Sequence, residues 1–241
     1  METPPDAPPQ EPVRRAFAPL GVALATTALC ALFAHAPILR DYAGTLIGLT
    51  FLAVTYVVVL RHDAATIRRY GLALGGLLEP EPIRPARLAR DALSALSWAL
   101  AFAVVIFPPF WFGWLRFWKP ESGFAPADFS VVRDAALTQL FAIALPEEAF
   151  YRGYLQSALD DVWPARIRVF GAAVGPSLLV TSALFALGHV ATEYHPNRLG
   201  VFFPSLVFGW LRARTGGIGA CLVFHALCNL FADYLAKSYG F

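Results

Sequence analysis

LPEEAFYRGYLQSAL, residues 145–159, carries two adjacent glutamates and an arginine inside an otherwise apolar helical run. A charged side chain at the centre of a membrane helix costs roughly 2.5 to 3.5 kcal/mol on insertion scales, so such groups usually line an internal cavity. Glu148 and Arg152 are four residues apart and share a helix face, whereas Glu147 lies about 100° around the helix. The spacing predicts an ion pair between Glu148 and Arg152 and leaves Glu147 free to act as an acid or base.

Pro146, directly before the two glutamates, removes a backbone donor from this run. A kink at this position would expose backbone groups and give water room beside the glutamates. The alternative interpretation is that both glutamates are structural and brace a helical bundle through Arg152.

The composition indicates a membrane protein. Of the 241 residues, 57% are hydrophobic and 15% are charged, which is too apolar for an ordinary soluble domain. We expect an all-α, polytopic transmembrane bundle of about seven spans, within limits of six to eight. The excess of arginine over lysine and the abundance of alanine suggest a bacterial source and hence the cytoplasmic (inner) membrane. Nothing in the sequence resembles a nucleic-acid-binding module.

Seven apolar runs define the expected spans. They cover residues 17–39, 42–60, 92–115, 134–159, 174–191, 199–211 and 218–235. With the N-terminus inside, twelve arginines and lysines fall on the inner side and six on the outer side, as the positive-inside rule requires. These limits place His189 nearer the outer end of its span than Glu147, which predicts strong tilt or shifted span ends.

The segments outside the spans are assigned by composition. Residues 1–15 are rich in proline and are expected to form a disordered tail rather than a signal peptide, followed by one helical domain over 16–241. Three prolines in the arginine-rich connection 61–91 are expected to break any long helix there. Trp111, Trp114 and Trp118 are expected at the lipid headgroups. No disulfide is expected among Cys30, Cys221 and Cys228.

Two further apolar runs carry polar residues at helical spacing. Phe185 and His189 are four apart, as are His225 and Asn229. The sequence Glu-Glu-x-x-x-Arg, then Phe-x-x-x-His, then His-x-x-x-Asn resembles the CPBP family of intramembrane proteases, which includes CAAX prenyl endopeptidases and bacteriocin-processing, Abi-like proteins. The resemblance covers residues 139–231, within an expected motif core of about 134–236.

The resemblance implies an intramembrane endopeptidase of glutamic type, with its active site in a membrane-embedded cavity. Glu147 and His189 would activate a water molecule, while His225 and Asn229 would donate to the oxyanion. Glu148 and Arg152 would hold the site's geometry, with Phe185 as a further support. The implied substrate is a peptide or a membrane-anchored protein, with membrane lipid as the surroundings and no cofactor.

Three alternatives stay open from the residues alone. Glu147, His189 and His225 form a set of the kind that binds catalytic zinc, although no His-Glu-x-x-His helix is present. Cys228 follows His225 by three residues and could form a nucleophile pair with it. Intramembrane acids and histidines also occur in proton-coupled transporters and non-catalytic binding scaffolds, but here they cluster in the C-terminal half without an internal repeat.

Overall fold

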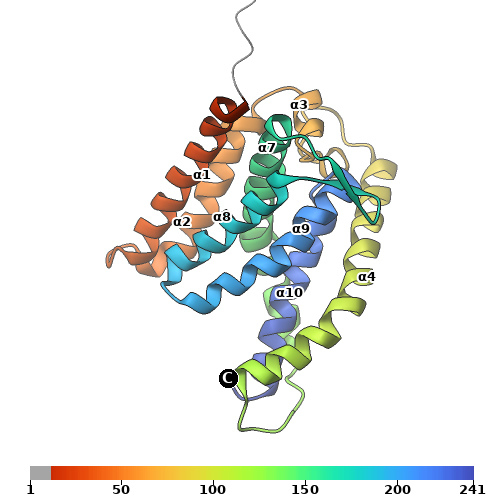
Figure 1. Ribbon diagram of the computed structural model, residues 1–241. Helices are drawn as coiled ribbons and strands as arrows, with labels where there is room; N and C mark the ends of the chain where they lie inside the picture. Colours follow the sequence, from red (N-terminus) through yellow and green to blue (C-terminus); the bar gives the residue numbers. More distant parts are fainter. Residues whose placement is uncertain (1–11) are drawn as a thin grey trace, which may run out of the picture.

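The computed structural model describes residues 12–241 and is a helical bundle (Figure 1). The long elements are α1 (Pro12–His35), α2 (Ala43–Thr55), α4 (Pro85–Trp118), α8 (Pro176–Glu193), α9 (Phe202–Thr215) and α10 (Gly219–Ser238). Shorter helical pieces are η1 (Arg40–Tyr42), η2 (Tyr56–Leu60), α3 (Ala64–Arg69), η3 (Leu74–Gly76) and η6 (Pro196–Val201). Because α1 begins at Pro12, the last residues of the predicted tail belong to this helix, and the rest of the tail lies outside the described residues.

Four helices are long and apolar enough to cross a membrane, within residues 12–241. They are Arg15–His35, Arg40–Leu60, Pro85–Trp118 and Gly219–Ser238. The remaining three predicted spans include α9, which has only 14 residues, and the helix with the glutamates, which is rich in charge. Seven crossings therefore stay a prediction, while the structure is a mostly helical bundle with four candidate membrane spans.

The glutamates lie on a continuous helical path, 130–162, that changes its winding four times. It consists of α5 (Ser130–Leu137), η4 (Thr138–Ala144), α6 (Leu145–Glu148), η5 (Ala149–Gln156) and α7 (Ser157–Val162). Both η4 and η5 are π-helical, with hydrogen bonds from i to i+5 in place of i+4. Pro146 thus lies in a short α-helical turn between two widened stretches, where the sequence predicted a single kink.

Helix α4 corrects the predicted third span. It begins at Pro85, seven residues before the expected start, because proline fits the first turn of a helix, where its missing N–H would have no partner in any case. Pro80 and Pro82 do precede the helix, but Pro85 starts it.

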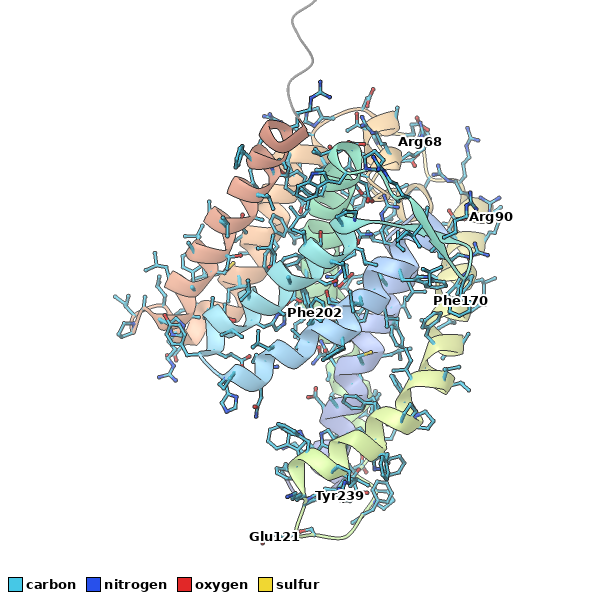
Figure 2. The ribbon with its side chains drawn as sticks, in the orientation of Figure 1. Arg68, Arg90, Glu121, Phe170, Phe202 and Tyr239 are labelled. Carbon is cyan, nitrogen blue, oxygen red and sulfur yellow. The ribbon has the colours of Figure 1, made fainter. Side chains whose placement is uncertain are left out.

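A small β-hairpin between α7 and α8 departs from the all-helical prediction. Strands β1 (Ile167–Val169) and β2 (Ala172–Val174) pair antiparallel through a two-residue turn at Phe170 and Gly171, whose φ angles are 45° and 83°. Positive φ at both positions is typical of the tight turns that suit the strand twist. Trp210 Nε1 donates to the Val169 carbonyl at 2.8 Å, which joins the hairpin to α9. Phe170 lies exposed at the edge of the molecule (Figure 2).

The bundle places the Glu-bearing helix at its centre. Helices α1 and α2 lie side by side at one edge and α4 forms the opposite edge, with α7, α8, α9 and α10 between them (Figure 1). At the far end, Trp114 is buried against Tyr239, and Trp111 Nε1 donates to the Tyr239 hydroxyl at 3.1 Å. Trp114 therefore packs against α10, whereas Trp118 is exposed, and the placement of these tryptophans at lipid headgroups stays a prediction.

Candidate active site

Three helices present polar side chains to one cavity of about 470 Å³. Glu147 comes from α6, Phe185 and His189 come from α8, and His225 and Asn229 come from α10. On α8 and α10 these residues are four apart and share one face, as their spacing predicts. The predicted difference in depth between Glu147 and His189 does not separate them, because both line this cavity.

The ion pair between Glu148 and Arg152 forms as predicted. Arg152 Nη1 donates to Glu148 Oε1 at 3.2 Å, and both side chains are fully buried. Arg152 Nη2 also donates to the hydroxyl of Ser205 at 2.6 Å and to its carbonyl at 3.2 Å. The guanidinium carbon lies 4.5 Å from the centre of the Phe185 ring, which gives this phenylalanine a supporting contact. A buried charge needs partners of this kind. Arg152 Nε and Glu148 Oε2 are nevertheless buried without a hydrogen bond to any described residue.

Glu148 also holds His225. His225 Nδ1 donates to Glu148 Oε1 at 2.8 Å, and the imidazole stacks on Phe208 with ring centres 4.7 Å apart and an angle of 16°. With Nδ1 engaged, Nε2 faces Glu147 Oε2 at 3.9 Å. The Arg152–Glu148–His225 series therefore fixes the orientation of the ring.

Glu147 keeps one carboxylate oxygen without a partner. Oε2 is buried and makes no hydrogen bond with any other described residue. Its 3.9 Å separation from His225 Nε2 is too long for a hydrogen bond. Because buried polar atoms are nearly always satisfied, an unpaired oxygen in a cavity marks a position that a water or a substrate can occupy. Glu148 is held through Oε1 by Arg152 and His225, although its own Oε2 is also unpaired, whereas Glu147 makes no hydrogen bond with another described residue.

His189 has a defined tautomer. Its Nδ1 lies 2.9 Å from the carbonyl oxygen of Phe185, and because a carbonyl only accepts, the proton is on Nδ1. In the neutral ring Nε2 then carries the lone pair, the state needed to accept a hydrogen bond from water. Phe185 thus supports the site through its backbone as well as through its ring.

Asn229 makes a contact that the sequence did not predict. Its Nδ2 donates to Gln139 Oε1 at 2.9 Å, and Gln139 Nε2 donates in turn to Asp233 Oδ2 at 3.1 Å. All three residues line the cavity. Sequence reasoning overlooked Gln139, Asp233 and the buried Ser205. Only Asp233 carried a readable signal, since it is four residues after Asn229 on α10.

The zinc alternative concerns Glu147, His189 and His225. Among residues 12–241, no group of three or more His, Cys, Asp or Glu side chains is placed to hold a metal ion. Each histidine of the predicted ligand set has its Nδ1 engaged, by Phe185 and by Glu148, which leaves Nε2 as the ring atom that could bind a metal. The cysteines are free thiols, and Cys228 lines the cavity without a hydrogen bond to His225.

Part of the chain matches a family model. Residues 133–231 match the family model described as Type II CAAX prenyl endopeptidase Rce1-like. No curated protein and no solved structure matches the chain. The matched segment runs from α5 into α10 and includes Glu147, Glu148, Arg152, Phe185, His189, His225 and Asn229. Over this segment, less than half of the chain, the match supports a CPBP/CAAX intramembrane protease family.

Proposed function

We propose that the protein is a glutamic-type endopeptidase, in which Glu147 and His189 activate a water molecule for direct attack on a peptide bond near the membrane surface. The observation that carries the proposal is the unpartnered Oε2 of Glu147, which is buried in the wall of the same cavity as His189. A general base must reach the proton that it removes, and a free carboxylate oxygen beside a neutral imidazole meets that requirement.

Each of the four residues has a role in the proposed chemistry, and Glu147 acts twice. Glu147 takes a proton from water as the oxygen bonds to the scissile carbonyl carbon, and His189 Nε2 accepts a hydrogen bond from the same water. The oxyanion accepts from Asn229 Nδ2–H and from His225 Nε2–H. Glu147 then gives its proton to the departing nitrogen as the carbon–nitrogen bond breaks.

His225 can donate at Nε2 only when both ring nitrogens carry protons, because Nδ1 already donates to Glu148. The positive charge of that form lies 2.8 Å from one carboxylate and 3.9 Å from the other. Glu148, backed by Arg152, is therefore assigned to orient His225 and to balance its charge.

We propose further that residues 16–241 form the protease domain, in the cytoplasmic membrane of a bacterium. Its substrate would be a peptide or a membrane-anchored protein. The cavity wall supports a membrane-embedded substrate, because apolar residues of α2 such as Ile47 and Phe51 line it together with the polar groups.

Replacing Glu147 tests the proposal. Glu147→Gln keeps the shape but removes the base, so turnover should fall by about 100-fold to 10,000-fold, the usual contribution of general base catalysis. Glu147→Ala should behave alike, and both variants should unfold at the wild-type temperature in detergent. Glu121→Gln, in the exposed connection after α4, is the matched control. Wild-type cleavage by Glu147→Gln would reject the assignment.

Chelation separates this mechanism from the zinc alternative. We expect the purified protein to retain its activity after exhaustive treatment with zinc chelators, because the proposed steps use only side chains and water. Elemental analysis accompanies the assay. One zinc per chain, lost and restored together with activity, would establish the metalloprotease instead.

A further inference from the structure

A chain of three polar side chains runs along the cavity wall. Asp233 is exposed, Gln139 and Asn229 are half-buried, and the hydrogen bonds between them measure 3.1 and 2.9 Å. Asn229 and Asp233 share a face of α10, whereas Gln139 comes from the π-helical stretch η4. Two helices are thus joined beside His225, through the amide assigned to the oxyanion.

Asp233 determines the direction of the two hydrogen bonds. An ionised carboxylate only accepts hydrogen bonds, so Gln139 must turn its NH₂ group toward Asp233. Its carbonyl oxygen then faces Asn229, and that oxygen also only accepts. Asn229 must therefore present its NH₂ group to Gln139. One hydrogen of this group is used in the contact, and the second remains for another acceptor.

Without this chain of hydrogen bonds, the side-chain amide of Asn229 could flip. A rotation of about 180° around χ2 exchanges the nitrogen and oxygen of a side-chain amide, which are almost identical in shape. The turned amide would present an acceptor where the oxyanion needs a donor, and the two would repel. The direction of the amide, beyond its presence, decides whether it can stabilise the transition state.

We propose that Gln139 and Asp233 are positioning residues that hold the Asn229 amide with its NH₂ group available to the oxyanion. This inference rests on the proposed role of Asn229. Both residues line the cavity, and the role assigned to them is exerted through Asn229. They affect kcat by orienting Asn229. They therefore stabilise the transition state more than the bound substrate.

Single substitutions give the first test. Gln139→Leu and Asp233→Leu should each lower kcat by about tenfold, equivalent to one net hydrogen bond, with KM unchanged. Asp233→Asn can still accept from Gln139 through its carbonyl oxygen and should restore most of the turnover. Asp134→Leu, an exposed acid on the same continuous helix as Gln139, should leave activity unchanged. Because Asp233 is exposed, its variants should fold even if Gln139→Leu does not. Full turnover in Asp233→Leu would overturn the proposal.

A double-mutant cycle with Asn229→Ala distinguishes positioning from a general structural role. Asn229→Ala alone should lower kcat by roughly 100-fold to 1,000-fold. Adding Asp233→Leu to it should cost nothing more, because no amide remains to be oriented. If the two losses multiply, Asp233 acts independently of Asn229 and the inference fails. If Asn229→Ala keeps full turnover, the donor role in the proposed function fails as well, and the two failures are thereby told apart.

Discussion

Arg152 is the residue whose removal should cost most stability. Arg152→Ala leaves the buried Glu148 carboxylate without its charge partner and removes the bonds to Ser205. Breaking a buried ion pair from one side costs about 3 to 5 kcal/mol. We expect a marked fall in the unfolding temperature in detergent and a low folded yield. Arg133→Ala, which removes an exposed pair with Asp134, should change neither. Equal melting of Arg152→Ala and wild type would contradict the account.

The sequence predicted the ion pair between Glu148 and Arg152 but not the residues that contact it from other helices. Glu148 and Arg152 lie on one helix, where spacing alone determines that they meet. Ser205 and His225 reach the pair from α9 and α10, and spacing within a helix does not say which faces of different helices come together. The polar motif residues were found because charge in an apolar run is costly, whereas Ser205 and Gln139 carry no charge to attract notice.

At the scale of elements, the π-helical winding of η4 should be needed for activity. Deleting Phe141, an exposed residue of η4, would remove the extra residue and allow ordinary α-helical winding. Gln139, which lies inside η4, would then shift relative to Asn229 on α10 and lose their hydrogen bond. We expect turnover to fall at least about tenfold, with helix content by circular dichroism unchanged. Deleting Gly123, in an exposed connection with open space around it, is the control. If both deletion variants have the same activity, the π-helical winding of η4 is not required for turnover.

Apolar runs predicted which segments are helical better than how those helices wind or where they start. The expected 42–60 and 218–235 runs agree closely with α2 plus η2 and with α10, since length and apolarity define them. The π-helical stretches were invisible because the same residues fit either winding. The hairpin was missed because each strand has only three residues, too few for an alternating pattern to stand out, although Gly171 at its turn was a usable signal.

For the whole molecule, the excess of arginine at one end predicts its orientation. Arg68 and Arg90 lie at one end and Glu121 at the other (Figure 2). Under the seven-span topology, Glu81→Cys should react with a membrane-impermeant maleimide only after the cells are opened. Glu121→Cys should react in intact spheroplasts. The parent protein is the control for reaction at its own thiols. Labelling of Glu81→Cys from outside would refute the predicted orientation.

The ribosome synthesises the partners of Arg152 and Glu148 well after the helix that carries these two residues. Ser205 follows Arg152 by 53 residues, and His225 follows Glu148 by 77. At the usual 5 to 20 residues per second, a ribosome needs roughly 4 to 15 seconds to synthesise those 77 residues. Until then the charged helix lacks part of the polar surroundings that it has in the finished protein. We therefore expect it to stay beside the translocon, where water can still solvate it, until α9 and α10 have been synthesised.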